Sequence, residues 1–263
     1  MAPQSLKSWT TGTGDAESML AEARKALFVM VGFLALLWII QIANVADHYG
    51  LVTEFGIKSR SVPGLPDIFT APFIHLSWTH IEANSGPLFI FGFLAAYRGV
   101  VRFFGLTLLV IVTSGFAAWL TAPTNSVGVG ASGVVFGYLG YILVRGLFDR
   151  HLIDLIIGAV MALCFAYQFT VLLPHAGIGW QDHVGGLVGG VIGGWVFRDR
   201  ARVRARKAAR PSKAGATGKP ATSAAATATS TGTAIVPATG SRPTVPYAGP
   251  RADLHKELDD LGL

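Results

Sequence analysis

The sequence is poor in charge and in cysteine. Only 14% of its 263 residues are charged, whereas 51% are hydrophobic. A soluble domain of this size carries roughly 25% charged residues, so the shortage argues against a soluble protein and for one that faces lipid, where exposed charge is costly. The one cysteine, Cys164, excludes an intrachain disulfide. Its apolar surroundings predict a buried, inert thiol.

No cleavable secretory signal is expected either, because the first 25 residues are polar. The first apolar run, residues 26–46, is long enough to cross a bilayer rather than be removed. Further runs cover residues 80–97, 103–120, 127–144, 152–173 and 180–197. We therefore predict an all-α membrane protein, a bundle of six transmembrane helices. The proline-containing but apolar loop 47–78 is expected to lie at the membrane interface.

Lys and Arg are distributed unevenly between the loops. The loops at 121–126 and 174–182 contain neither, whereas basic residues occur at Arg98, Arg102, Arg145 and Arg150 and in a dense run after residue 197. Since basic loops stay in the cytoplasm, both termini are predicted to be cytoplasmic. The net charge of +6 is thereby explained by topology, and no nucleic-acid partner is expected.

The chain divides into segments by composition. These are a cytoplasmic N-terminal segment at 1–25, a six-span membrane domain at 26–197, a basic cytoplasmic segment at 198–213 and a tail at 214–263. The tail is rich in Ala, Thr and Pro and has too few large apolar residues to form a core, so it is predicted to be disordered.

A few polar side chains lie inside the apolar runs, where such residues suggest function by default. His80 and Asn84 are four residues apart and share one helical face. An interfacial histidine, a polar packing pair or a metal half-site would each explain them. Ser132 stands among glycines that suit helix packing, and His183 precedes a G-x-x-x-G pair that lets helices approach. No single position identifies a function.

The predicted topology brings these residues to one depth, near the outer ends of the second, fourth and sixth spans. A serine with a histidine base is a sufficient nucleophile pair. The Asn84 amide, the His80 ring and the Ser132 backbone N–H could stabilise an oxyanion. Asp182 points about 100° away from its neighbour His183 on a helix, so we expect it at the water boundary.

Two soluble motifs compete for the serine region. Residues 128–133 match G-x-G-x-x-G, but a dinucleotide loop needs a preceding strand and a βαβ unit, and here a membrane span contains it. The G-x-S-x-G elbow of soluble hydrolases fails because Val134 replaces its second glycine. Both interpretations are excluded.

Taken in order, three motifs resemble the bacterial type of the rhomboid family of intramembrane serine proteases. They are the H-x-x-x-N pair of "HIEAN", the G-x-S-G serine of "GVGASGVVFG" and the histidine of "DHVGGLVGG". The resemblance covers about residues 55–197 and implies a six-helix rhomboid bundle with a membrane-embedded first loop. Gly86 and Pro87 depart from the bulkier residues usual after the asparagine, which allows a bent second helix.

The resemblance implies a role for each site residue. Ser132 is the expected nucleophile and His183 its general base, without a carboxylate, while His80 and Asn84 line the oxyanion site. The expected supporting residues are Gly130 at the loop-to-helix transition, Gly133, Phe136 beneath the His183 ring, and Gly186, which brings the last span against the serine span.

The expected activity is hydrolysis of peptide bonds in or near single-span transmembrane segments of membrane proteins. The expected location is the plasma (inner) membrane of a bacterium, with the lipid bilayer as surroundings and no metal or cofactor. Two alternatives remain: a catalytically silent rhomboid-like protein that binds or chaperones membrane proteins, and a small transporter.

Overall fold

The computed structural model describes residues 6–174 and 179–199, and these belong to one compact unit that spans Met1–Pro211. The predicted disordered tail and most of the basic segment at 198–213 lie outside the described residues. The elements, in chain order, are α1 (Leu6–Ala46), α2 (Gly50–Phe55), β1 (Ile57–Lys58), η1 (Leu65–Phe69), η2 (Ala71–Phe73), α3 (Trp78–Ala96), α4 (Val100–Thr121), β2 (Val127–Gly128), α5 (Ser132–Asp149), α6 (Leu152–Cys164), η3 (Ala166–Leu172) and α7 (Trp180–Val196).

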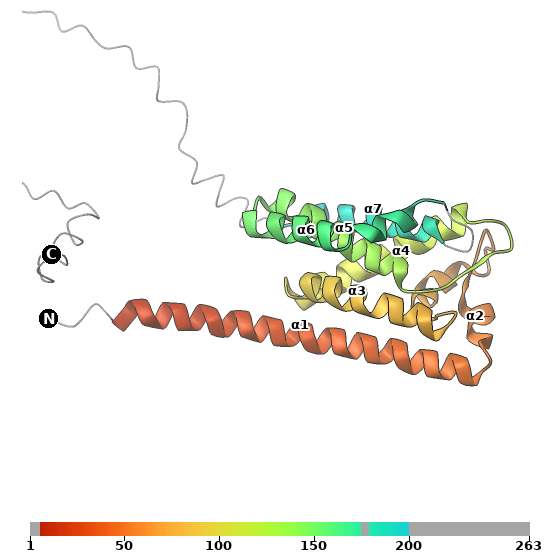
Figure 1. Ribbon diagram of the computed structural model, residues 1–263, viewed down its shortest axis with the longest axis horizontal. Coiled ribbons are helices and arrows are strands. Elements are labelled where there is room, and N and C mark those ends of the chain that lie inside the picture. The colour runs from red at the N-terminus through yellow and green to blue at the C-terminus, as the bar shows by residue number, and fades with distance from the viewer. Residues whose placement is uncertain (1–5, 175–178, 200–263) are drawn as a thin grey trace, which may run out of the picture. The chain divides into compact units, whose positions relative to one another are not determined.

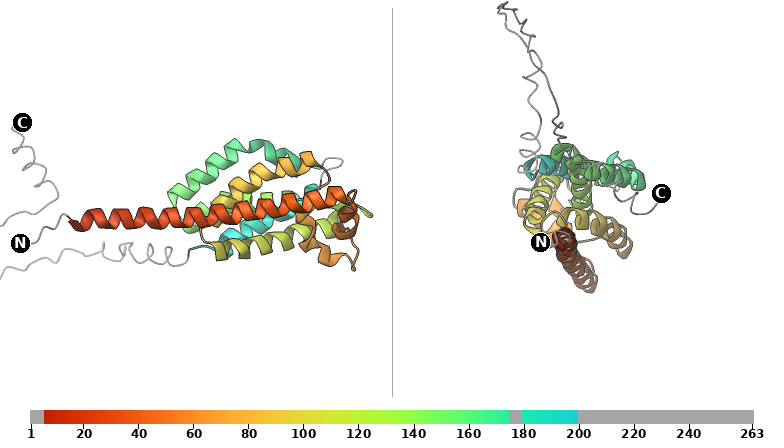
Figure 2. Two further views of the ribbon diagram at one scale, coloured as in Figure 1. Left: turned by 90° about the horizontal axis from the view of Figure 1, so that it is seen from below. Right: turned by 90° about the vertical axis from the view of Figure 1, so that its left-hand side faces the viewer.

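The long helices lie side by side, and α1 extends beyond the others at its amino end (Figures 1 and 2). Helix α5 occupies the centre, in contact with α3, α4, α6 and α7. Several of its large side chains, among them Tyr138 and Leu139, are fully buried. Because almost every face of α5 meets another helix, this element holds its first residue, Ser132, in a fixed position.

Glycines let α7 touch α5 through the main chain. A Cβ at Gly186 would lie 2.0 Å from the Gly133 carbonyl oxygen, and one at Gly190 would lie 1.9 Å from that of Gly137. No side chain larger than hydrogen fits at these two positions. The small-residue pattern of the last helix therefore has a direct steric cause.

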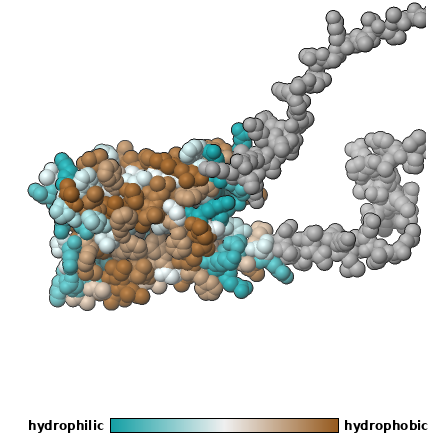
Figure 3. All heavy atoms as spheres, turned by 180° about the vertical axis from the view of Figure 1, so that it is seen from behind, coloured by the Kyte–Doolittle hydropathy of each residue, from teal (hydrophilic) through white to brown (hydrophobic). Residues whose placement is uncertain are grey.

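On the face shown in Figure 3, exposed apolar side chains cover the middle of the bundle and hydrophilic residues gather at its two ends. Large apolar side chains that are more than half exposed include Phe28, Ile39, Val101 and Leu163. A surface of this kind suits lipid and not water. Cys164 is also exposed, so the expected buried thiol was wrong: it sits where α6 ends, on the outside of the bundle.

Among the described residues, two helices are long and apolar enough to cross a membrane by themselves, within Ala16–Ala46 and Val100–Thr121. A third candidate is the pair α6 and η3, which is bent by 69°. Helices α3 and α7 are shorter or carry polar residues and glycines in their first halves. The protein is thus an α-helical membrane protein, and the count of six spans stays a prediction.

Three details differ from the sequence-based expectations. A short antiparallel ribbon, with Ile57 opposite Gly128, adds strands to the all-α prediction. The serine helix begins at Ser132 rather than near residue 127, because the ribbon and a left-handed glycine occupy the residues before it. Arg145, expected in a loop, lies inside α5 with a side chain that is 3% exposed.

Candidate active site

Ser132 is the first residue of α5 and is half-buried. The turn before it depends on Gly130, whose φ of 122° is strained for any residue with a side chain. A Cβ at Gly130 would also lie 2.7 Å from the His80 ring. The helix start exposes backbone N–H groups beside the serine, and the helix dipole favours negative charge there.

His80 and Asn84 lie on α3 next to this turn. The Ser77 hydroxyl caps α3 by accepting from the His80 backbone N–H at 3.1 Å. The Leu76 N–H donates to His80 Nδ1 at 3.4 Å. Since Nδ1 accepts a hydrogen bond, the ring proton of a neutral His80 is on Nε2. That Nε2 is 2.8 Å from the place of a Cβ on Gly130, so it faces the serine turn as a donor.

The Asn84 amide is a second donor in the same place. Asn84 is 7% exposed. Its Nδ2 is buried and has no hydrogen-bond partner within residues 6–174 and 179–199. Leaving a buried amide unpaired costs roughly 1–3 kcal/mol. An unpaired buried donor at this cost is typical of a group that binds a ligand. An oxyanion on a substrate bound at Ser132 would supply the partner.

His183 is held on α7 by two contacts. Its Nδ1 lies 2.9 Å from the Val171 carbonyl oxygen, and its ring lies 4.7 Å from the Phe136 ring at 30°. A carbonyl only accepts hydrogen bonds, so Nδ1 carries the hydrogen and Nε2 keeps its lone pair. This is the tautomer that a general base needs.

Asp182 reaches into the site, although sequence reasoning placed it at the water boundary. Its Oδ2 accepts a hydrogen bond from the Ser132 hydroxyl at 3.4 Å, and its Oδ1 accepts one from the backbone N–H of His183 at 3.0 Å. Oδ1 is also 3.8 Å from His183 Nε2. The side chain is only 19% exposed. Helical spacing predicts the direction in which a side chain leaves α7. It does not predict that the Asp182 side chain extends across to α5.

His75, in the loop before α3, was missed. Its Nε2 accepts from the Ala131 N–H at 3.4 Å, and its ring lies 5.0 Å from that of His80. Burial, and secondarily the nearby His80, lowers the pKa of His75 from 6.5 to about 3. His75 is therefore neutral and supports the residue just before Ser132. A lone histidine in an apolar loop was the only sequence signal.

The remaining predicted residues pack the site together. Gly133 lies where a Cβ would meet the Ser114 hydroxyl, and Gly186 lies against the Gly133 carbonyl. Within the described residues, no three His, Cys, Asp or Glu side chains gather as metal ligands. The site thus brings together a serine, a histidine with a free Nε2, a carboxylate and two uncharged donors.

The chain is similar in sequence to several known proteins. An uncharacterized protein of Mycobacterium leprae is 33% identical over 184 residues, 64% of this chain and 72% of that protein. Rhomboid protease GlpG of Haemophilus influenzae is 25% identical over 178 residues, 65% of this chain and 90% of that protein. Rhomboid-like protein 11, chloroplastic, of Arabidopsis thaliana is 36% identical over 132 residues, 46% of each chain.

A family model described as the rhomboid domain matches residues 64–200. The matched region is more than half of the chain and contains α3, α5 and α7, the helices that carry the site. That extent of similarity shows that this chain belongs to the rhomboid family.

Proposed function

We propose that this protein is an intramembrane serine endopeptidase in which Ser132 is the nucleophile and His183 the general base. The observation that carries the proposal is the His183 tautomer, since the Val171 carbonyl leaves Nε2 free to accept a proton. Ser132 Oγ and His183 Nε2 both approach one carboxylate, at 3.4 and 3.8 Å. If the Ser132 hydroxyl donated its hydrogen bond to His183 Nε2 instead of to Asp182, His183 could take its proton.

The reaction proceeds through an acyl-enzyme. Ser132 Oγ attacks the scissile carbonyl carbon as its proton moves to His183 Nε2. The oxyanion accepts hydrogen bonds from Asn84 Nδ2, His80 Nε2 and the N–H at the start of α5. When the peptide C–N bond breaks, Nε2 returns the proton to the leaving amine. Water then attacks the ester, with His183 again as base, and releases the carboxyl product.

The substrates would be single-span membrane proteins. A helical substrate must unwind near the cleaved bond, because helical carbonyls are hydrogen-bonded and shielded. Residues that weaken helices are therefore expected near that bond. The proposed arrangement is six spans in a bacterial plasma membrane, with both termini in the cytoplasm and the site near the outer surface.

The test uses purified protein in proteoliposomes with a fluorophosphonate probe and a single-span reporter substrate. Ser132→Ala and His183→Ala should abolish labelling and cleavage. Asn84→Ala should lower kcat by about 100- to 1000-fold, the usual loss for one oxyanion donor. If Ser132→Ala cleaves like the wild type, the protease proposal is wrong. If the wild type binds the reporter but neither cleaves it nor reacts with the probe, the silent binding alternative holds.

A further inference from the structure

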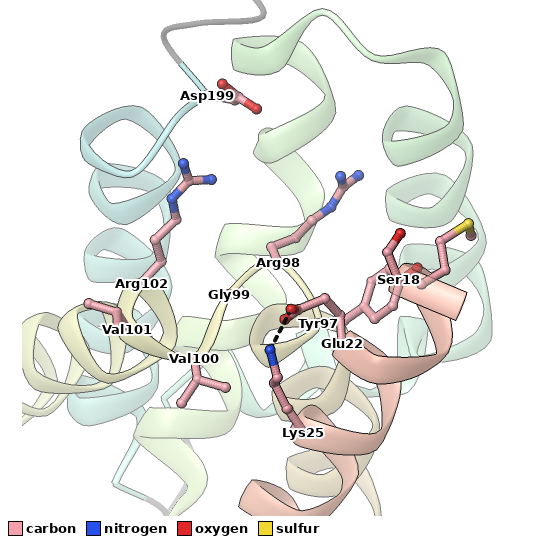
Figure 4. A pocket seen from close by; sticks show the side chains of 11 residues that line it. Ser18, Glu22, Lys25, Tyr97, Arg98, Gly99, Val100, Val101, Arg102 and Asp199 are labelled. Atoms are coloured by element: carbon pink, nitrogen blue, oxygen red, sulfur yellow. Dashed lines mark hydrogen bonds and ion pairs between the residues drawn. The ribbon is translucent and has the colours of Figure 1, made fainter. Parts of the chain in front are cut away.

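A depression of about 650 Å³ lies at the end of the bundle away from the candidate active site. Helix α3 carries His80 in its first turn and ends at Ala96, so the residues just beyond it line the far end. Figure 4 shows the depression between the amino-terminal half of α1, the α3–α4 turn and the residues that follow α7. Its charged side chains are Glu22, Lys25, Arg98, Arg102 and Asp199.

The wall of the depression holds a positive charge in place. Asp154 is 1% exposed and accepts from both Arg98 and, at 2.8 Å, Arg145. Two guanidinium groups share one carboxylate, so one positive charge is not balanced by this cluster. Arg145 is buried, whereas the Arg98 side chain is 25% exposed and lines the depression. Arg98 is therefore a fixed cation at the surface.

Arg102 adds a second positive group. It is exposed, and within the part of the chain that the structure describes no hydrogen bond or ion pair of its side chain is seen. Its guanidinium extends in the same general direction as that of Arg98 (Figure 4). Lys25, by contrast, is paired with Glu22 at 2.8 Å. Both arginines line the same depression, and guanidinium groups bind phosphate well.

The edge of the depression is apolar. Val101 lines it and is 87% exposed, and Phe104, one turn along α4, is 59% exposed. Both are large apolar side chains left exposed on the outside of the bundle. A free phosphate ion would gain nothing from this edge, whereas a phospholipid could lay an acyl chain along α4 with its phosphate at the arginines.

We infer that this depression binds the headgroup of an anionic phospholipid. Arg98 and Arg102 contact the phosphate, and Val101 and Phe104 contact the first part of an acyl chain. Basic pockets between helices at the cytoplasmic membrane surface suit such headgroups. The inference requires neither the Ser132–His183 pair nor peptidase activity.

The test is a titration of the full-length protein, in neutral detergent, with a fluorescent phosphatidylglycerol. Arg102→Gln should weaken binding about fivefold, the loss expected for one basic residue near a membrane surface. Asp199→Asn should strengthen binding, because it removes a negative charge from the same wall. Lys58→Gln, which removes a basic residue at the opposite end of the bundle, is the matched control and should bind like the wild type.

Competition separates the sources of the anion. Unlabelled phosphatidylglycerol should displace the probe, whereas equal concentrations of phosphatidylcholine or inorganic phosphate should not. The inference is overturned if Arg102→Gln binds like the wild type, if phosphatidylcholine competes equally, or if phosphate alone displaces the probe. Because the readout is binding, inactivity toward the peptidase reporter would leave this result unchanged.

Discussion

The imidazole of His183 owes its orientation to a main-chain carbonyl and an aromatic ring, at 2.9 Å from Val171 O and 4.7 Å from Phe136. In many serine hydrolases a carboxylate fills the orienting role. Here the carboxylate of Asp182 lies on the other side, next to Nε2 and Ser132 Oγ. We therefore expect Asp182 to affect the stability of protonated His183 during the reaction more than the position of the His183 ring.

Replacing Asp182 with asparagine tests this expectation. The change keeps the shape and removes a carboxylate oxygen 3.8 Å from His183 Nε2, whose charge would stabilise a protonated imidazole. We expect kcat for the reporter to fall at least tenfold with KM nearly unchanged, and Asp182→Glu to recover part of the loss. An unchanged kcat in Asp182→Asn would show that the carboxylate has no part in the reaction.

His75 makes a prediction about pH. Its pKa is about 3 when folded against 6.5 as an ordinary histidine, so the unfolded chain binds the extra proton between these values. Stability should therefore fall as the pH drops from about 6.5 towards 3, by up to about 1.4 kcal/mol per pH unit from this residue. Thermal unfolding in detergent at pH 7 and pH 5 measures the effect.

The control for that measurement is His75→Gln, which keeps an acceptor for the Ala131 N–H but does not titrate. Its stability should change less between pH 7 and pH 5 than that of the wild type. Equal changes in the two proteins would mean that other groups cause the acid sensitivity.

Sequence reasoning reached the residues of the site that occur in motifs, and it missed those that depend on long-range contact. Ser132 and His183 were predicted to lie together from the order of the predicted spans, and the structure places them 3.4 and 3.8 Å from the Asp182 carboxylate. The reach of Asp182 to another helix, and the support of Ala131 by His75, arise from contacts between segments about 50 residues or more apart in the chain. Spacing along one helix contains no information on such contacts.

At the scale of elements, the contact between α5 and α7 is the one on which the site depends most. A Cβ on Gly190 would lie 1.9 Å from the Gly137 carbonyl oxygen, so Gly190→Ala must push the helices apart. We expect a loss of about 1–3 kcal/mol of stability, as for other overpacked contacts, and a large loss of fluorophosphonate labelling because His183 moves with α7.

Gly32→Ala is the matched control. No atom lies within 4 Å of a Cβ at Gly32, and the residue is inside α1. Alanine is favoured over glycine in a helix by about 1 kcal/mol, so this variant should be at least as stable as the wild type and label normally. If Gly190→Ala behaves like Gly32→Ala in melting temperature and labelling, close contact of the two helices is not needed.

Element boundaries followed the apolar pattern where nothing competed with it. The run predicted at 103–120 became α4, Val100–Thr121. The run at 152–173 instead broke into α6 and η3 with a 69° bend. No proline marks the break around Phe165, and hydrophobicity continues through it, so composition gave no warning. The bend nevertheless matters, because it belongs to the segment that presents the Val171 carbonyl to His183.

For the whole molecule, the predicted topology is open to a direct test. In a Cys164→Ala background, Lys58→Cys and Arg102→Cys place single thiols at opposite ends of the bundle. With six spans and cytoplasmic termini, a membrane-impermeant maleimide should label the first variant in intact cells and the second only after permeabilisation. The reverse pattern would invert the proposed orientation, and labelling of both in intact cells would contradict a bundle that crosses the membrane.

The main-chain contact between α5 and α7 also limits how this protein can evolve. Where two backbones touch, no side chain is present whose size could change. The separation of Ser132 and His183 therefore cannot be adjusted by gradual substitution at the contact. Divergence in speed or selectivity among descendants would have to accumulate in the first loop and in η3, whose side chains and carbonyls surround the site. A residue larger than glycine at position 186 or 190 in a descendant would be expected to move α7 away from α5, and His183 away from Ser132.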